Sequence, residues 1–418
     1  MIYMSNAPRL RQSLSNALSV VLPTREETLL LRACLSSAEA VRQSWEAWQR
    51  LRNDLRTGSL TDSQTVKKLQ LLVFDALRRS ALEVDKESQT YLRSAYLQED
   101  WRSKIVRRIC REVLRLFESH DIPVIVLKGV ALAETVYESP VLRHCHDIDL
   151  LIRDQDMSRA MTLLPSIEFK EIDSKAEPGS SDCQLEHESG LPLELHRALF
   201  KLPYYNELLG ETWKRSRNQV IADVQTKILA PADNLLHVCG HAFHESRRGS
   251  LRWVSDAWFI IDRHRDLDWD LVFDCADRSH LALPLSVTLA YLAEDLNAPI
   301  PSSFLARLFA AASKSSAIER ELALFGAHSR PQGSLVALFR RMRDWRGRAF
   351  MIQWLLLPSP AYLFMVEEAR PSWPLPFHYI YRPLRYARQF IDSKFAGLIR
   401  RIKWRVDRFF LRTDYRTP

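Results

Sequence analysis

Apolar residues recur at helical spacing along the first part of the chain. They fall every three or four positions in the series Leu31, Leu35, Ala38, Val41 and Trp45. The same period returns further along the chain at Leu69, Val73 and Leu77, and residues 86–118 contain few helix breakers. This period is typical of a helix with one buried face. We therefore predict that residues 16–121 are helical.

The hydrophobic pattern changes at residue 122. Short apolar runs rich in β-branched residues are typical of buried strands and here replace the helical period. The predicted elements, in order, are a strand at 124–127, a helix at 130–136, a strand at 147–152, a helix from Asp154 to Leu164, a strand at 169–172, and a hairpin of 184–188 and 191–196. Pro192 hints that the second hairpin strand lies at a sheet edge. Residues 122–197 thus have the pattern of a small mixed α/β unit.

Helical spacing returns after Pro231 and continues to about residue 365. Three prolines between 371 and 376 then form a stiff linker to the tail. The expected units are an N-terminal helical segment (1–121), a mixed-sheet core (122–200), a C-terminal helical domain (201–370) and a basic aromatic helical tail (371–418). The predicted fold class is α+β, with the small mixed sheet embedded between N-terminal and C-terminal helical segments.

Composition narrows the class of protein only a little. The 418 residues include 59 Lys and Arg against 51 Asp and Glu, a formal net charge of +8, which suits nucleotides, nucleic acid or anionic lipid as partners. A hydrophobic content of 46% with only 11 Gly excludes a disordered or collagen-like chain. The six Cys form no C-x-x-C pair, no signal-peptide pattern is visible, and no window of about 18 apolar residues occurs. We expect a cytoplasmic protein.

The strongest chemical feature is the pair Asp147 and Asp149 on a predicted strand. Side chains two residues apart on a strand point to the same face, so both carboxylates project together while Ile148 and Leu150 face the core. Such close carboxylates repel each other, and a shared divalent cation relieves the repulsion. One or two carboxylates with substrate phosphates are the usual ligands of Mg²⁺, in sites that carry out phosphoryl transfer. Solvated acids at a strand edge are the alternative for the pair alone.

The hairpin offers a third carboxylate. Its three leucines at 191, 193 and 195 are expected to face the core, which leaves Glu194 and His196 on the opposite face. If this strand lies beside the Asp147 strand, Glu194 completes a site of three carboxylates. The solvated face of an amphipathic strand is the alternative.

Lys128 and Gly129 end the first predicted strand and begin a helix. Glycine allows the backbone to approach a phosphate closely, and a helix N-terminus attracts anions. Lys128 can meet a triphosphate as a point charge. Arg143, four residues before Asp147, is a second candidate for anion contact.

Two histidines at 237 and 241 have a spacing that zinc can use on a helix. No third ligand is evident, so a packing role is favoured, with hydrogen bonds to Asp256 or to the catalytic cleft. In that role His241 and Asp256, together with His196, would help to shape an acceptor site.

The tail has ten Lys or Arg between residues 378 and 412, with aromatic residues interleaved. Such a helix can lie on an anionic membrane or contact nucleic acid. A solvated basic face with the aromatics packed on the body is the favoured alternative, and we find no strong nucleic-acid signal. A peripheral membrane location through the tail stays open.

Several segments occur in a characteristic order along the chain. They are residues 126–132, Arg143 with 147–152, 193–196, 229–237 with His241, 252–256, 268–269, 357–360 and 381–384. Together they resemble the bacterial uncharacterised nucleotidyltransferase family, which is part of the DNA polymerase β-like superfamily. The resemblance extends from about residue 25 to about residue 390.

This resemblance implies an enzyme that transfers a nucleoside monophosphate, with AMP from ATP favoured, to a hydroxyl acceptor and releases pyrophosphate. Asp147, Asp149 and Glu194 would bind Mg²⁺, and Glu194 would also help to activate the hydroxyl. The nucleotide contacts would come from Lys128, Gly129 and Arg143. The acceptor, a protein or a small molecule, is not identified.

One departure from the superfamily pattern leaves an alternative open. The phosphate turn usually reads Gly-Ser or Gly-Gly, but here Gly129 is followed by Val130, which offers no hydroxyl. The alternative is a catalytically dead nucleotidyltransferase-like interaction module, docked at a membrane surface through the tail.

Overall fold

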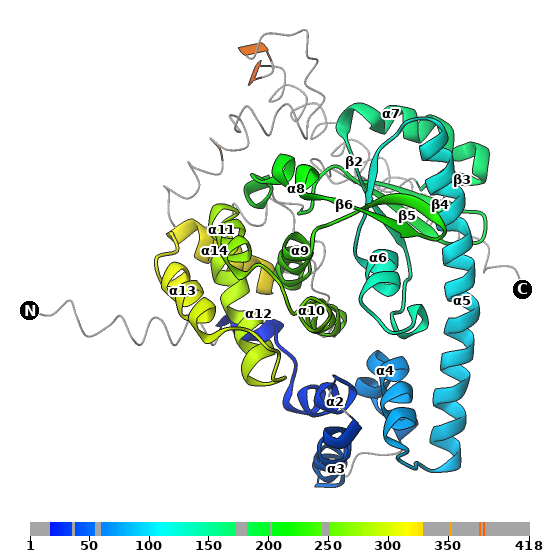
Figure 1. Cartoon of the computed structure of the whole chain (residues 1–418), viewed down its shortest axis with the longest axis vertical. Helices are drawn as coiled ribbons and strands as arrows, with labels where there is room; N and C mark the ends of the chain where they lie inside the picture. Colours follow the sequence, from blue (N-terminus) through cyan, green and yellow to red (C-terminus); the bar gives the residue numbers. More distant parts are fainter. Residues whose placement is uncertain are drawn as a thin grey trace, which may run out of the picture.

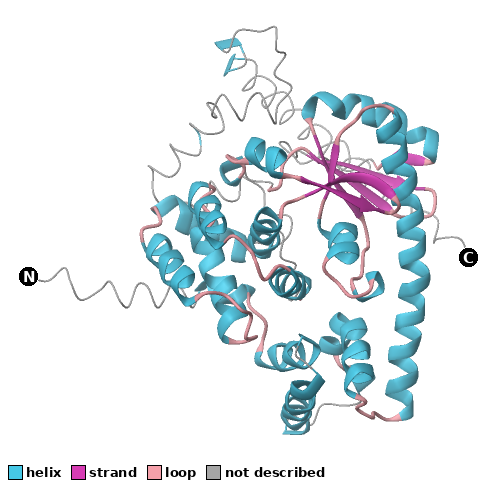
Figure 2. Cartoon of the chain, in the orientation of Figure 1, coloured by secondary structure: helices cyan, strands magenta, loops and turns pink. Residues whose placement is uncertain are grey.

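The computed structural model describes residues 17–328 apart from 36–37, 55–59, 173–181, 201–202 and 245–250, together with positions 352, 376–377 and 379–380. Within this part of the chain, helices surround one mixed β-sheet (Figures 1 and 2). The fold class is therefore α+β, as predicted. The predicted tail and its proline linker lie outside the described residues, apart from four isolated positions.

Four helices form the N-terminal segment, as the apolar spacing predicted. They are α2 (Arg25–Leu35), α3 (Ala38–Asp54), α4 (Gln64–Ser80) and α5 (Lys86–Ser119). The side chain of Ser63 caps α4 by accepting from the Val66 N–H, and Asp85 caps α5 by accepting from the Ser88 N–H at 2.8 Å. Helix α5 is a single helix of 34 residues, and Figure 1 shows it running from the N-terminal helices to the sheet.

The sheet has seven strands in the order β3-β4-β5-β2-β1-β7-β6. Their bounds are β1 (Val124–Val126), β2 (Ile148–Ile152), β3 (Phe169–Glu171), β4 (Asp182–His187), β5 (Pro192–His196), β6 (Arg217–Ile221) and β7 (Val224–Ile228). Strand β5 lies between β4 and β2, so the edge position inferred from Pro192 is wrong. Pro192 is the first residue of β5, where a missing N–H does not interrupt the ladder.

The sheet continues past residue 200, where the predicted core ended. Strands β6 and β7 form an antiparallel hairpin, and β7 pairs in parallel with β1. The turn residues Ala222 and Asp223 both have positive φ, at 49° and 63°. Turns of this kind match the twist of the strands but are normally built from Asn and Gly. Because neither residue type occurs here, the sequence did not reveal the hairpin.

Different helices pack on the two faces of the sheet. On one face, α5, α6 (Lys128–Thr135) and α7 (Asp154–Leu163) bury a cluster with alternate strand residues that include Ile148, Leu150, Leu193 and Leu195. On the opposite face, α8 (Leu209–Arg215) contributes Leu209 to a smaller cluster with residues of β1 and β2. The candidate site lies on this second face.

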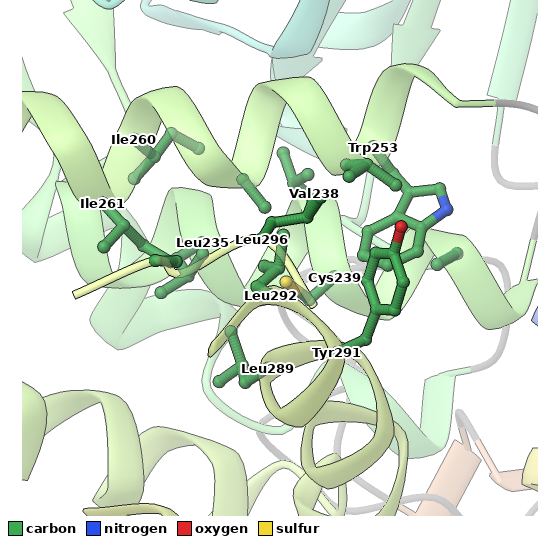
Figure 3. Packing of buried hydrophobic residues seen from close by; sticks show 14 of the residues in the cluster. Leu235, Val238, Cys239, Trp253, Ile260, Ile261, Leu289, Tyr291, Leu292 and Leu296 are labelled. Carbon is green, nitrogen blue, oxygen red and sulfur yellow. The ribbon is translucent and has the colours of Figure 1, made fainter. Parts of the chain in front are cut away.

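The remaining helices form a body that shares its core with the N-terminal segment. They are α9 (Pro231–His244), α10 (Arg252–Arg263), α11 (Trp269–Arg278), α12 (Ala282–Glu294), α13 (Ser302–Ser313) and α14 (Ala317–His328). Figure 3 shows side chains of α9, α10 and α12 interlocking, for example Val238, Ile260 and Leu292. The Thr28 hydroxyl lies 3.0 Å from the Tyr291 hydroxyl. One hydrophobic cluster therefore joins helices from both ends of the described chain. Within the described residues no helix is both long and apolar enough to cross a membrane.

Candidate functional site

The parallel pairing of β2 with β5 brings acidic residues together. Asp149 is directly opposite Glu194 in the register of the two strands. Because side chains alternate along a strand, the leucines beside them are buried on the other face, and Asp149, Glu194 and His196 share one face. The condition set by the sequence, that the Glu194 strand lies beside the Asp149 strand, is therefore met.

Three of these side chains form a compact cluster. Asp149, Glu194 and His196 each offer one ligand atom, and those atoms lie within 4.8 Å of one another. His196 Nε2 is 2.8 Å from Asp149 Oδ1 and 3.6 Å from Glu194 Oε2. Gln184 of β4 donates from Nε2 to Glu194 Oε1 at 3.0 Å. Asp149 and His196 are buried, whereas Glu194 is half-buried.

Asp147 lies beside this cluster, one residue before β2 begins. Burial raises the pKa of its carboxyl to about 7, and the nearby charges of Asp149 and Glu194 add to the rise. Lys128 and Arg143 act on the same pKa in the opposite direction. Three carboxylates are thus near enough to repel one another, which is the condition that a divalent cation relieves.

A chain of hydrogen bonds connects Asp147 to the helical body and fixes its position. Arg252, the first residue of α10, has Nη1 2.7 Å from His146 Nδ1, and His146 Nε2 is 3.0 Å from Asp147 Oδ2. Because arginine only donates, Nδ1 accepts, and the ring proton is then on Nε2, from which it is donated to Asp147. Burial, with the charge of Arg252 as the next cause, lowers the pKa of His146 to about 4. The imidazole is therefore neutral near pH 7 and orients the carboxylate.

The guanidinium of Arg143 forms hydrogen bonds with other groups of the protein. It donates from Nε to Asp256 Oδ1 at 3.1 Å and from Nη2 to Asp256 Oδ2 at 2.8 Å. The third donor, Nη1, binds the backbone oxygen of His144 at 2.9 Å, and Tyr137 donates to Asp256 Oδ1 at 2.6 Å. Burial alone would lower the pKa of Arg143, but Asp256 outweighs it, so the guanidinium stays charged.

Helix α5 holds the middle of the same loop. The Glu99 carboxylate is 2.7 Å from His144 Nδ1, and Arg102 donates from Nε to the backbone oxygen of Cys145 at 3.1 Å. Residues 143–147 are therefore fixed from both α5 and α10 before the chain enters β2.

Lys128 and Gly129 are the first two residues of α6. Lys128 has a φ of 32°, which is uncommon for a residue with a Cβ. A Cβ on Gly129 would lie 3.5 Å from Cys145 Sγ and 3.7 Å from the backbone oxygen of Asp147. The N-terminus of α6 is thus close to the loop that carries Asp147. Val130, which replaces the usual turn hydroxyl, is buried in the core of the sheet.

His237 and His241 belong to the core of the helical body. The ring of His237 packs edge-on to Phe200 and to His241, with centroids 5.7 Å and 4.8 Å away. Asp256 accepts from Tyr137 and Arg143 within the described residues, and the contact expected of the two histidines with Asp256 or with the catalytic cleft stays a prediction. The acceptor-site roles suggested for His241 and Asp256 gain no support from these contacts.

Sequence reasoning missed His146, Arg252 and Gln184 as supports of the carboxylates. Arg252 and Asp256 are four residues apart and so share one face of α10. That spacing was visible in the sequence, but their partners, more than 100 residues away, were not.

Comparison with known proteins identifies a family for the chain. The model of the family described as uncharacterised nucleotidyltransferase matches residues 53–297, more than half of the chain. The match includes every element of the site and ends before the segments at 357–360 and 381–384. No match to a curated protein was found.

Proposed function

This chain belongs to the uncharacterised nucleotidyltransferase family, and we propose that it transfers a nucleoside monophosphate from a nucleoside triphosphate to a hydroxyl group. The observation that carries the proposal is the pairing of Asp149 with Glu194 on one face of two parallel strands, with Asp147 beside them in the loop that leads into β2. Lys128 and the N-terminus of α6 lie beside the same group.

The donor atoms of the cluster suit a divalent cation. Carboxylate oxygens and one imidazole nitrogen lie within 4.8 Å of one another. Burial, and after it the charges of Asp149 and Glu194, raise the pKa of Asp147, so a cation there would stabilise the ionised carboxylates. Asp147, Asp149 and Glu194 would hold the cation. When bound, it would neutralise the charge of the polyphosphate and make the α-phosphorus more electrophilic.

Glu194, Gln184 and Lys128 have distinct roles in the proposed reaction. Glu194 accepts the proton of the acceptor hydroxyl through Oε2, while Gln184 fixes its other oxygen. The hydroxyl oxygen forms a bond to the α-phosphorus, the bond from that phosphorus to the bridging oxygen breaks, and pyrophosphate leaves with the electron pair. Lys128 and the first N–H groups of α6 orient the polyphosphate.

Arg143 receives a different role from the one suggested by its sequence position. All three of its nitrogen atoms donate within the protein, so we assign it to positioning the loop that carries Asp147. Nucleotide contacts are then left to Lys128 and the backbone at Gly129.

The test uses the full chain with ATP labelled at the α-phosphate, or at the γ-phosphate as a control for kinase activity. Mg²⁺ or Mn²⁺ is supplied, and the acceptor source is a cell extract divided into protein, nucleic-acid and small-molecule fractions. The other three nucleoside triphosphates are compared with ATP, because the site residues do not identify the base.

We expect transfer of the α-label and not of the γ-label. The variants Asp149→Asn and Glu194→Gln should lose it, whereas Glu171→Gln, an exposed carboxylate on β3 of the same sheet, should behave like the wild type. Label transfer that survives Asp149→Asn would overturn the proposal. Absence of transfer, together with an affinity for Mg²⁺ and nucleotide that does not depend on these carboxylates, would favour the catalytically dead interaction module instead.

A further inference from the structure

His196 occupies a position that the proposed reaction does not yet use. It is the last residue of β5, two residues after Glu194 and on the same face. The residue is only 5% exposed, and its Nε2 is 2.8 Å from Asp149 Oδ1 and 3.6 Å from Glu194 Oε2. The ring therefore presents one nitrogen to both carboxylates at once.

These separations are close to those found within the first coordination shell of a single cation. Ligand atoms at about 2.1 Å from an ion, at right angles to each other, lie about 3 Å apart, and opposite ligands lie about 4.2 Å apart. The 2.8 Å separation between His196 Nε2 and Asp149 Oδ1 is near the first of these values, and the 3.6 Å separation to Glu194 Oε2 lies between the two. All the ligand atoms lie within 4.8 Å of one another, a limit slightly above the separation of opposite ligands. One ion can thus contact all three side chains with only small movements.

An imidazole in this set changes which ion the site favours. Mg²⁺ is a hard cation that takes oxygen ligands and retains several waters. Imidazole nitrogen is a ligand of transition-metal ions. Carboxylates with one histidine therefore form a mixed set better suited to a divalent transition metal than to Mg²⁺.

We infer that His196 is a metal ligand through Nε2, and that the site consequently prefers a divalent transition-metal ion such as Mn²⁺ over the Mg²⁺ expected from the sequence. This inference rests on the proposed function, because it refines the cation used at the same site. It adds a ligand, His196, to the three carboxylates.

The competing role for His196 is that of a hydrogen-bond donor that only holds Asp149. The variant His196→Gln separates the two roles, since the amide of Gln keeps an N–H donor at a similar reach but removes the imidazole. The matched control is His187→Gln. His187 is a buried histidine on the neighbouring strand β4, and its ring nitrogens face Ser189 and Glu168, outside the cluster.

The experiment is pulsed electron paramagnetic resonance of the full chain loaded with Mn²⁺ alone, combined with titrations of Mn²⁺ and of Mg²⁺. We expect hyperfine coupling to an imidazole nitrogen in the wild type and in His187→Gln, and its loss in His196→Gln. The ratio of Mn²⁺ to Mg²⁺ affinity should fall by about tenfold or more in His196→Gln, which is the low end of losses seen when the surroundings of a metal are altered.

Absence of nitrogen coupling in the wild type would overturn the inference, and so would coupling that persists in His196→Gln. Either result leaves the proposed function intact, provided that the wild type transfers nucleotide and Asp149→Asn does not. Conversely, nitrogen coupling in a chain that transfers nothing would support the metal ligand and count against the nucleotidyl transfer.

Discussion

The buried ion pair between Arg143 and Asp256 allows stability and catalysis to be separated. The two residues are 8% and 3% exposed and share two hydrogen bonds, and Tyr137 donates to the same carboxylate. The variant Asp256→Ala leaves a buried guanidinium without its counter-charge. Removing one partner of such a pair costs about 3–5 kcal/mol, a large part of the total stability of about 5–15 kcal/mol of a typical protein.

Replacing both partners with apolar residues should largely restore the fold. The double variant Arg143→Met with Asp256→Leu removes both charges, and such replacements are often neutral. Tyr137 loses one acceptor but keeps its hydrogen bond to Ser255 Oγ at 3.1 Å, so a residual loss of about 1 kcal/mol is expected. The loop before β2 nevertheless loses one of its two contacts with α10, since only that of His146 with Arg252 is left. We therefore expect a folded double variant with much slower nucleotidyl transfer.

The measurements are urea unfolding followed by circular dichroism, and transfer of the α-phosphate label at saturating nucleotide. The control is Asp274→Ala, which breaks an exposed pair with Arg278 at 3.1 Å on α11 and should cost less than about 1 kcal/mol. A cost below about 1 kcal/mol for Asp256→Ala would show that the pair does not hold the fold. Full recovery of both stability and transfer in the double variant would refute the positioning role.

Three further predictions test other parts of the structure. Because the pKa of Asp147 is raised to about 7, the apparent affinity for Mn²⁺ should rise about tenfold per pH unit up to 7 and then level off. Metal affinity is the quantity to measure, because the contributions of Asp147 and of His146, whose pKa is lowered to about 4, change the unfolding free energy in opposite directions between about pH 4 and 6.5. A Mn²⁺ titration that is flat between pH 5.5 and about pH 7 would contradict the prediction. Lys128→Met should weaken binding of ATP by about tenfold or more but leave AMP binding nearly unchanged, since a charge-assisted hydrogen bond to the polyphosphate contributes about 1.5–3 kcal/mol. Equal losses of affinity for ATP and AMP in calorimetry would exclude a polyphosphate contact. Gly240→Ala should lower the unfolding free energy by about 1–3 kcal/mol, measured by thermal unfolding, because the new Cβ would lie 2.7 and 2.8 Å from ring atoms of the buried Phe200. Unchanged stability would mean that the ring moves aside freely.

The sequence predicted which face of the sheet carries the carboxylates, because that depends only on the alternation of side chains along a strand. Asp149 and Glu194 each sit between buried leucines or isoleucines on short strands, so each points to the opposite face. Their side-by-side pairing was a conditional expectation, since strand order is a property of the whole sheet. The structure supplies that order through the parallel pairing of β2 with β5.

The supports of the site could not be predicted in the same way. Arg143 reaches Asp256 across 113 positions of sequence, and no local period encodes which helix meets which loop. The hairpin of β6 and β7 was missed for another reason, because Ala222 adopts a positive φ without the usual glycine or asparagine. The amphipathic period of α2 likewise predicted a buried face but not its contact with Tyr291.

The positions of these contacting residues indicate how much of the chain is needed to form the site. The loop that carries Asp147 is held by hydrogen bonds from α5 and α10 and lies beside the N-terminus of α6. Helices α5 and α10 lie outside the predicted core of residues 122–200. A fragment limited to that core would keep Asp149 and Glu194 on their strands but lose the contacts that orient Asp147. The family match, residues 53–297, contains α5, α6 and α10. The helical segments are therefore part of the catalytic apparatus in the proposed enzyme, since they fix the geometry of a carboxylate that the sheet alone does not hold.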